Sequence, residues 1–518
     1  MIRSFVTVLS GTMASRLLGF VRDGLIAALL GAGPVADAFL AAFQLVNVIR
    51  RLLTEGALNA ALVPAWLRIY QDAGATKAAA FAGRVLGTVS AGLLAVTIVL
   101  AALMPLALTV LAPGFAGEET LTFAVNDARL MLPYLAFAGP STVLLALSSA
   151  QGRYALAAFA PLLFNLALIA ATIVLLAQHQ DPAIAAPLLA ATIGIAGLLQ
   201  LVMIALRKRR GSIATPLRVA FDAEMRGFFA KALPGMIASA GPQLLAVGGA
   251  IVASTAPSAV SWLYFANRLI ELPLGLVGVA MGTVLVPELT RALHAGNKDA
   301  FAQVQSRGLE LTTGLALPAT LGLVILNEPI VRLLFEHGAF TPDDAAATAR
   351  VLTWLALALP AQVLTKALQP AFFACEDMRT PLHATLIGCG TAIALAFLLG
   401  QALGASGIAV GLALGAWANA AVLIRRGAAS FGLAILPASR RRLPRIALAA
   451  AAMGAALWAT AALTIGSQQS GPHGIAVLLA LIAAAVILYA LLLLALGVTS
   501  WRDTVHAVRQ RPARDLHL

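Results

Sequence analysis

Long apolar runs separated by short polar segments recur along the whole chain of 518 residues. A helix that crosses a bilayer needs about 20 mostly apolar residues, and scanning for runs of that length predicts fourteen spans. Their expected ranges are 5–30, 36–66, 79–111, 128–150, 156–177, 184–206, 228–254, 258–287, 302–326, 345–373, 381–402, 407–424, 445–465 and 475–497. The pattern therefore predicts an all-α, polytopic membrane protein.

Composition agrees with this class. Hydrophobic residues make up 60% of the chain and charged residues 11%, and the mean hydropathy is +0.92. A soluble domain is nearer a quarter charged. The net charge of +13 could indicate a nucleic-acid partner, but the basic residues lie in short runs between apolar segments. That distribution is typical of membrane topology, so we expect no nucleic-acid binding.

The basic residues also predict the orientation of the chain. With the N-terminus in the cytoplasm and the sides alternating, the cytoplasmic segments hold 26 of the 35 Lys and Arg. The opposite side holds three: Arg129, Arg332 and Arg350. This bias follows the positive-inside rule, so we expect both termini in the cytoplasm.

An internal repeat predicts how the spans are grouped. The segment from Leu135 to Leu144 (LAFAGPSTVL) resembles that from Leu355 to Leu364 (LALALPAQVL), and an even number of predicted helices separates them. Two parallel six-helix lobes with two further helices fit this spacing. The expected divisions are an N-lobe at 1–210, a basic linker at 211–232, a C-lobe at 233–426, a basic linker at 427–444, and the last two helices with a basic tail at 445–518.

Charged side chains lie inside several predicted spans. At the bilayer centre an Arg or Asp costs about 2.5–3.5 kcal/mol on insertion scales, so such residues must pair or face a water-filled cavity. Six basic residues belong to this set: Arg16, Arg22, Arg50, Arg51, Arg268 and Lys366. Four acidic residues join them: Asp23, Asp37, Glu55 and Glu271.

Two interpretations of these charges stay open from the residues alone. The first is structural pairing. Helical spacing allows the pairs Arg51–Glu55, Arg268–Glu271 and Arg16–Asp23. The second is an anion site, because guanidinium stays charged and grips phosphate through two parallel hydrogen bonds. The basic residues outnumber the acidic ones by two, which favours an anion.

Several motifs contain or flank these charged residues and others lie later in the chain. They are Ser15-Arg-Leu-Leu-Gly-Phe-Val-Arg-Asp23, Asp37-Ala-Phe39, Asn47-Val-Ile-Arg-Arg51, Glu55-Gly-Ala-Leu58, Tyr264-Phe-Ala-Asn-Arg-Leu-Ile-Glu-Leu-Pro273, Leu334-Phe-Glu-His-Gly-Ala-Phe-Thr341 and Ala371-Phe-Phe-Ala-Cys-Glu-Asp-Met-Arg-Thr-Pro381. Together these motifs closely resemble those of the MurJ (MviN) family of lipid II flippases, in the multidrug/oligosaccharidyl-lipid/polysaccharide (MOP) exporter superfamily.

The resemblance implies a fold and a function. The two lobes would form a V around a central cavity in the bacterial cytoplasmic (inner) membrane. The protein would move lipid II, the undecaprenyl-diphosphate-linked peptidoglycan precursor, from the inner to the outer leaflet by alternating access. Its implied partners are lipid II, membrane lipids and the cell-wall synthesis machinery. The last two helices would form a groove for the lipid tail.

The resemblance also implies site residues. The family's cavity arginines fall on Arg16, Arg22, Arg50 and Arg268. The supporting cavity residues are Asp23, Asp37, Asn47, Arg51, Glu55, Glu271 and Lys366. Some members bind sodium through carboxylates, but 232–254 and 381–424 contain no Asp or Glu. We therefore expect no sodium site of that kind, no other metal and no cofactor.

Other functions fit the intramembrane charges either as well as a lipid II flippase does or less well. A flippase for another polyprenyl-diphosphate-linked glycan could use the same arginines, as could a different exporter of the superfamily. A drug antiporter for cations would favour an acidic cavity, and a scaffold protein would leave the charges unexplained. The sequence contains no convincing phosphate-binding glycine loop, metal-ligand cluster or nucleophile–base pair, so we do not expect an enzyme.

Overall fold

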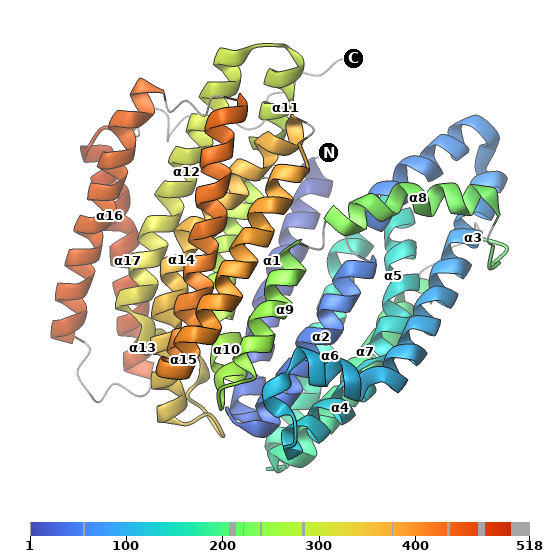
Figure 1. Ribbon diagram of the computed structural model, residues 1–518, viewed down its shortest axis with the longest axis horizontal. Helices are drawn as coiled ribbons and strands as arrows, with labels where there is room; N and C mark the ends of the chain where they lie inside the picture. Colours follow the sequence, from blue (N-terminus) through green and yellow to red (C-terminus); the bar gives the residue numbers. More distant parts are fainter. Residues whose placement is uncertain are drawn as a thin grey trace. The chain divides into compact units, whose positions relative to one another are not determined.

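The computed structural model describes residues 2–54, 57–206, 214–220, 222–238, 241–281, 285–375, 377–431, 436–464 and 472–498. Within these ranges the regular structure is helical and contains no strand (Figure 1), which confirms the predicted all-α class.

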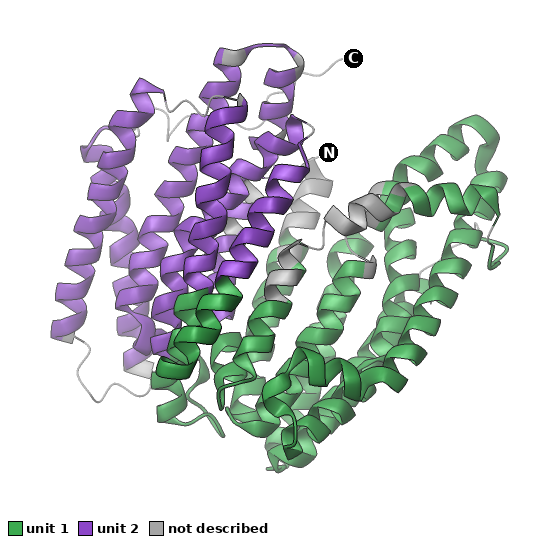
Figure 2. Ribbon diagram, in the orientation of Figure 1, with its two compact units in different colours: residues 1–265, 334–348, 392–411 green, residues 266–333, 349–391, 412–518 purple. Residues whose placement is uncertain are grey.

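The chain divides into two compact units (Figure 2). Unit 1 comprises Met1–Phe265, Leu334–Thr348 and Ala392–Gly411, and unit 2 comprises Ala266–Leu333, Ala349–Thr391 and Leu412–Leu518. The lobe boundaries expected from the sequence stay a prediction.

Unit 1 contains most of the N-terminal helices. They are α1 (Ile2–Leu30), α2 (Pro34–Thr54), α3 (Ala57–Leu111), the short 3-10 helix η1 (Pro113–Phe115), α4 (Glu119–Met131), α5 (Pro133–Ala150), α6 (Tyr154–Ala177), α7 (Pro182–Leu206), α8 (Ala223–Ala238) and α9 (Gly241–Ala253). Four later helices have residues in both units: α10 (Ala259–Ala280), α13 (Asn327–Phe335), α14 (Pro342–Ala374) and α15 (Arg379–Phe431). The remaining helices belong to unit 2: α11 (Val286–His294), α12 (Lys298–Ile325), α16 (Pro437–Thr464) and α17 (Pro472–Ala495).

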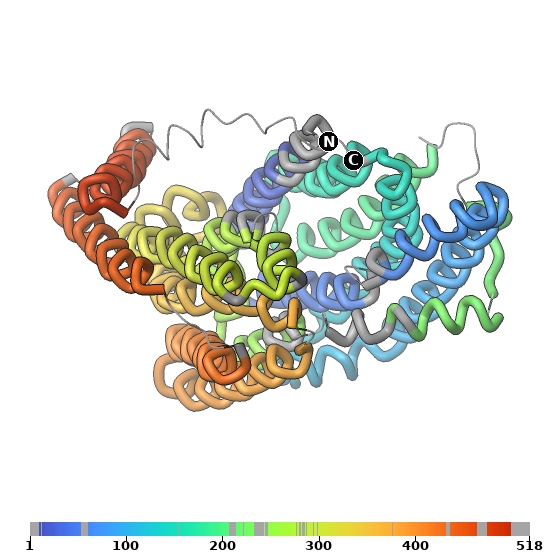
Figure 3. The backbone as a smooth tube through the Cα atoms, turned by 90° about the horizontal axis from the view of Figure 1, so that it is seen from above, coloured from blue at the N-terminus to red at the C-terminus, as the bar shows by residue number. Residues whose placement is uncertain are grey.

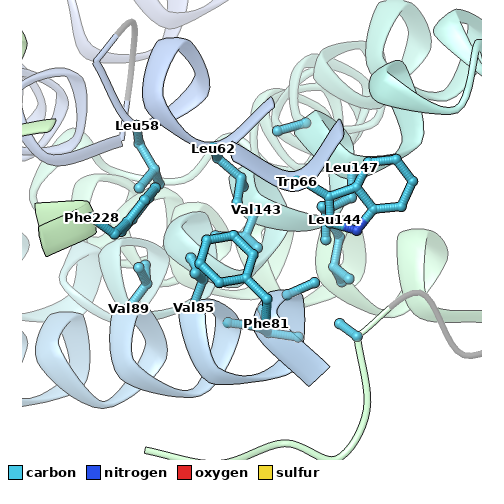
Figure 4. Close-up of a cluster of buried hydrophobic side chains, with 14 of the residues drawn as sticks. Leu58, Leu62, Trp66, Phe81, Val85, Val89, Val143, Leu144, Leu147 and Phe228 are labelled. Atoms are coloured by element: carbon cyan, nitrogen blue, oxygen red, sulfur yellow. The ribbon is translucent and has the colours of Figure 1, made fainter. Parts of the chain in front are cut away.

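Helices of unit 1 pack in pairs that are distant in sequence. α1 packs against α6, α2 against α4, and α3 against α5, while α7 contacts α4, α5 and α6. A hydrophobic cluster joins α3, α5 and α8 (Figure 4). At its centre Phe81 of α3 meets Phe228 of α8 edge to face, with ring centroids 5.8 Å apart, an arrangement that aromatic pairs favour.

In unit 2 the last two helices stand side by side, with α16 also packed on α12 (Figures 1 and 3). Two hydrogen bonds tie α17 to its neighbours. The Tyr489 hydroxyl donates to the Gly314 carbonyl of α12 at 2.8 Å, and Arg445 of α16 donates to the Leu496 carbonyl at 3.1 Å. The second bond satisfies a carbonyl just beyond the C-terminal end of α17, where a cation is favourable.

Several predicted spans match single helices closely. The expected 156–177, 184–206 and 302–326 correspond to α6, α7 and α12. The expected 36–66 falls instead on α2 and the beginning of α3. α3 continues to Leu111 through Gly74, which has a φ of +82°, a conformation that glycine adopts without a steric penalty. The expected 381–402 and 407–424 are likewise the two parts of α15, joined at Gly404.

The expected span 128–150 begins too late. α4 starts nine residues earlier, at Glu119, and α5 follows from Pro133. The first turns of α4 contain Glu119, Thr120, Asn126 and Asp127, so an apolar scan does not detect them. Nine helices within the described ranges are long and apolar enough to cross a membrane by length and composition.

The segment 214–220 lies along α3. The backbone N–H groups of Thr215 and Arg218 donate to the carbonyls of Ala79 and Gly83, and the Thr88 hydroxyl exchanges hydrogen bonds with the backbone of Ala220. The contact is close because α3 presents glycines to it. A Cβ atom on Gly87 would lie 2.4 Å from the Arg218 carbonyl oxygen.

An ion-pair cluster continues this contact into α8. Arg84 of α3 donates to Asp222 at 2.8 Å and to Glu224 at 2.6 Å. Asp222 also caps α8 by accepting from the Met225 N–H at 2.9 Å. The Met225 hydrogen bond and then Arg84 lower the pKa of the Asp222 carboxyl. All three charged side chains are partly exposed, so the pairs contribute modestly.

Gly87→Ala should loosen this segment, and Gly92→Ala is the matched control on the same helix. A Cβ on Gly92 meets nothing within 4 Å. Overpacking at Gly87 should cost about 1–3 kcal/mol, whereas Gly92→Ala should be neutral or slightly stabilising through helix propensity. Thermal unfolding and hydrogen exchange of residues 214–220 measure both effects. Equal protection of 214–220 in the two variants would show that the close contact is unimportant.

Candidate functional site

The structure distributes the predicted intramembrane charges over four helices. α1 carries Arg16, Arg22 and Asp23, and α2 carries Asp37, Asn47, Arg50 and Arg51, all in unit 1. Arg268 and Glu271 of α10 and Lys366 of α14 belong to unit 2. Glu55 lies outside the described residues.

Arg22 is buried, with 7% of its surface exposed. Its Nε and Nη2 atoms donate to the same oxygen of Asp23, Oδ1, at 2.9 and 2.6 Å. Its Nη1 atom donates to the Asn165 side-chain oxygen at 3.0 Å. The guanidinium also lies 5.2 Å from the ring centroid of Phe43 and 5.9 Å from that of Phe164, within the range of cation–π attraction. Charge and hydrogen bonding of Arg22 are therefore satisfied by partners from α1, α2 and α6.

Asn165 fixes the orientation of Arg22. Its Nδ2 atom donates to the Ser15 carbonyl of α1 at 3.1 Å, so its oxygen is turned toward the guanidinium. The sequence analysis did not single out this residue. The available signal was a carboxamide in the middle of an otherwise apolar helix, where polar side chains usually hydrogen-bond to a neighbouring helix.

Asp23 pairs with its neighbour rather than with the expected residue. The sequence suggested Arg16, which lies seven positions earlier on the same face of α1. Instead Asp23 accepts from Arg22, and Arg16 is exposed. Adjacent residues point about 100° apart on a helix, but the long Arg side chain can fold back to reach the carboxylate. The Tyr264 hydroxyl of α10 also donates to Asp23 Oδ1, at 3.3 Å.

Asp37 caps the N-terminus of α10. Its Oδ1 atom accepts from the backbone N–H of Ser261, the third residue of that helix, at 2.8 Å and also from the Ser261 hydroxyl. A carboxylate at this end satisfies an otherwise unpaired N–H and interacts favourably with the helix dipole. Only 3% of the surface of Asp37 is exposed.

A second carboxylate reaches the same helix end. Asp344 accepts from the Trp262 indole N–H of α10 at 3.1 Å. Asp344 and Thr341 also hydrogen-bond to each other's backbone N–H groups, in the capping-box arrangement, at the start of α14. The first turn of α10 is thus held by α2 and α14 within unit 1.

The other polar residues of α2 make fewer described contacts. The Asn47 amide donates to the Phe43 carbonyl one turn earlier, at 3.0 Å. Arg50 is half-buried and Arg51 is exposed. The predicted pair between Arg51 and Glu55 falls partly outside the described residues.

Unit 2 contains the pair that helical spacing predicted on α10. Arg268 Nη1 donates to Glu271 at 2.7 Å, which confirms that expectation. Both side chains are partly exposed, at 24% and 43%. Lys366 of α14 is exposed and reaches toward α10, where its Nζ atom lies 3.5 Å from the position that a Cβ on Gly278 would take.

The predicted site arginines have different surroundings in their own units. In unit 1, Arg22 is buried and hydrogen-bonded to Asp23 and Asn165, while Arg16 and Arg51 are exposed. In unit 2, Arg268 is partly exposed. Within the described residues, no three His, Cys, Asp or Glu side chains form a potential metal-ligand group. An exposed guanidinium such as that of Arg16 can hold an anion by charge and hydrogen bonding.

Comparisons with known proteins fit this geometry. The family model described as "Lipid II flippase MurJ" matches residues 26–470. A probable lipid II flippase MurJ from Rhizobium meliloti (strain 1021) is 38% identical over 465 residues, which cover 88% of this chain and 86% of that protein. The lipid II flippase MurJ of Burkholderia cenocepacia is 32% identical over 434 residues, covering 81% and 82%.

Solved structures show the same fold. A lipid II flippase MurJ in an inward closed conformation matches with a TM-score of 0.79 at 21% identity, over 96% of this chain and all of that one. An inward-facing multidrug resistance transporter of the MATE family, in the MOP superfamily, matches with a TM-score of 0.69 at 16% identity, over 85% and 98%. By its family-model match and by relatives that are more than 30% identical over four fifths of its length, the chain belongs to the lipid II flippase MurJ family.

Proposed function

We propose that this protein is a lipid II flippase, which moves the undecaprenyl-diphosphate-linked peptidoglycan precursor from the inner to the outer leaflet of the bacterial cytoplasmic membrane. The observation that carries the proposal is the family match over residues 26–470. The buried, hydrogen-bonded guanidinium of Arg22 agrees with it, since such an ion within an apolar bundle needs a reason to be there.

The diphosphate would be held by Arg16, Arg22, Arg50 and Arg268. Arg16 is exposed and lies on the same helix as Arg22, so an incoming anion could meet it first. Contact with Arg22 would require its guanidinium to share or exchange the Asp23 and Asn165 oxygens that it now contacts. Phosphate competes well for such a group because it accepts charge-assisted hydrogen bonds from a planar fork.

Arg268 would contribute from α10. Its partner Glu271 is 43% exposed, so the pair is open to water and its net stabilisation is small. A diphosphate could therefore displace Glu271 from Arg268 at low cost. Lys366 and the remaining acidic residues would set the net charge of the cavity around the four arginines.

The transport cycle would be alternating access without covalent chemistry. The prenyl tail would stay in lipid while the headgroup crosses between the lobes. Moving one charge through the full membrane potential is worth about 2.3 kcal/mol per 100 mV, so neutralisation of the diphosphate by arginines changes the driving force directly. No residue is required to make or break a bond, and we propose that the protein is not an enzyme.

We further propose fourteen spans with both termini in the cytoplasm, arranged as lobes at 1–210 and 233–426 and a final pair at 445–518. Nine helices within the described ranges are long and apolar enough to cross a membrane. The other five proposed spans would be α1, α2, the segment that contains α8 and α9, α10, and the second part of α15, which begins after Gly404. The strong bias of Lys and Arg between alternate segments supports the orientation.

Complementation tests the proposed function. Cells depleted of their own lipid II flippase should grow when this protein is expressed, and should expose lipid II headgroups on the outer leaflet. The Arg22→Ala variant, matched for amount in the membrane, is the control for activity. Failure of the well-expressed protein to restore headgroup exposure would contradict the proposal.

Arg22→Lys should impair flipping more than Arg51→Lys. Lysine keeps the charge at position 22 but loses the planar fork that contacts Asp23 and Asn165. A lysine would also lose the second of two parallel hydrogen bonds to the diphosphate. Loss of one such charge-assisted hydrogen bond, worth about 1.5–3 kcal/mol, predicts roughly a tenfold or greater decrease in rate. Arg51 is exposed, so its substitution should be tolerated. Headgroup exposure at matched expression measures both, and equal activity would favour a diffuse positive potential instead.

Cysteine labelling tests the topology. Native Cys375 and Cys389 are first replaced, and single cysteines are introduced near 210, 300 and 440 and near 118 and 343. An impermeant thiol reagent should reach the first group only from the cytoplasm and the second only from outside. Labelling of 210 and 343 from the same side would exclude the fourteen-span arrangement.

A further inference from the structure

Asp127 is a carboxyl group buried among apolar residues of α4. It belongs to a stripe of buried residues at helical spacing, with Thr120, Ala124 and Met131. Only 2% of its surface is exposed. α4 packs against α2, α3, α5, α7 and η1, so Asp127 lies inside the bundle of unit 1.

Among the described residues, the Asp127 carboxyl has no partner that would stabilise a negative charge. Its Oδ2 atom is buried and accepts no hydrogen bond from any described residue. Arg129, two residues later, is exposed and donates from Nε to the Ala101 carbonyl of α3.

The packed helices offer few charged groups. Besides Asp127, α4 contains two charged residues, Glu119 and Arg129, and both are exposed. α7 and η1 contain no titratable residue, and α5 contains only Tyr134. α2 has its charges in its end turns, with Asp37 engaged by Ser261. The titratable residues of α3 lie between 68 and 84, whereas Arg129 contacts α3 at residue 101. The titratable groups of α2 and α3 are Asp37, Arg50, Arg51, Arg68, Tyr70, Asp72, Lys77 and Arg84.

An ionised carboxylate in this position would cost several kcal/mol, because it would leave water without gaining a counter-ion or a full set of hydrogen bonds. A protonated carboxyl avoids the cost. It has no net charge, and burying its O–H group in an apolar site costs much less free energy than burying an ion.

We propose that Asp127 is a proton-binding site of unit 1, occupied while α4 is packed as described and emptied when water reaches it. In the second step the carboxyl O–H bond breaks, the proton passes to a water molecule, and the carboxylate remains. Protonation thus favours the packed state of the helices around α4, and rising pH favours a hydrated state. This linkage rests on the proposed flippase function. It makes the rate of the transport cycle depend on pH through a residue outside the diphosphate site.

Infrared spectroscopy of the full-length protein in lipid, without substrate, tests the site directly. At neutral pH the wild type should show the C=O stretching band of a protonated carboxyl, and Asp127→Asn should remove it. Asp343→Asn is the matched control, because Asp343 is an exposed carboxyl in the same unit, and it should leave the band in place. A spectrum that Asp127→Asn does not change would overturn the proposal.

A second measurement addresses the linkage. One proton bound in only one state changes an equilibrium by up to about tenfold per pH unit, so Asp127→Asn should flatten the pH dependence of headgroup exposure relative to Asp343→Asn. An unchanged pH profile would overturn the linkage to transport. Absence of transport in every variant would contradict the flippase function instead, and the infrared band would still decide whether Asp127 binds a proton.

The Asp127→Leu variant is a control for the case in which the Asp127→Asn variant misfolds. If the group is neutral in the folded bundle, an apolar residue of similar size should keep the thermal unfolding temperature near that of the wild type. A large destabilisation by both Leu and Asn would indicate an ionised, structurally paired Asp127 and would overturn the proposal.

Discussion

Charge cannot enter an apolar helix bundle without partners, and this constraint explains the packing around Arg22. The guanidinium is buried, so it needs both a counter-ion and acceptors for its N–H groups. Asp23 supplies the charge, Asn165 supplies a further acceptor, and the rings of Phe43 and Phe164 lie within cation–π range of the guanidinium. These groups come from α1, α2 and α6. The buried guanidinium therefore constrains how those three helices pack against one another, and which ligands they can bind.

Buried carboxylates at helix ends in unit 1 also need partners that stabilise their charge. Asp37 and Asp344 are largely buried, and both accept hydrogen bonds from the first turn of α10. A carboxylate placed there is stabilised by N–H donors and by the helix dipole rather than by a basic side chain. The acidic residues of the membrane region therefore fall into different chemical environments. Asp23 neutralises an arginine, Asp37 caps a helix, and Asp127 has neither kind of partner among the described residues.

Much of the architecture could be predicted from apolar run lengths, because bilayer thickness fixes the length of a span. α6 and α7 were predicted to within two residues at each end. The failures have physical causes. α4 begins with polar residues that an apolar scan rejects, and the expected span 36–66 ran across α2 and the first part of α3. The scan did separate the two helical parts that meet at Gly404.

Within the candidate site, sequence spacing identified the pair Arg268–Glu271, which needs only one helix. It did not identify Asn165 or the pairing of Arg22 with Asp23. The Asn165 contact depends on which distant helix packs against α1, and helical periodicity contains no such information. The Arg22–Asp23 contact depends on how the Arg22 side chain folds back along its own helix, which residue spacing does not predict. The family motifs supplied the cavity arginines as a set but not their different degrees of burial.

Reconstitution tests the central claim most directly. Purified protein in vesicles with a labelled undecaprenyl-diphosphate-linked disaccharide-peptide should make the label accessible at the opposite surface faster than protein-free vesicles do. The Arg22→Ala protein, incorporated in equal amount, should be close to the protein-free rate. Label movement by the wild-type protein no faster than in protein-free vesicles would contradict the claim that these intramembrane arginines carry a diphosphate-linked lipid across the membrane.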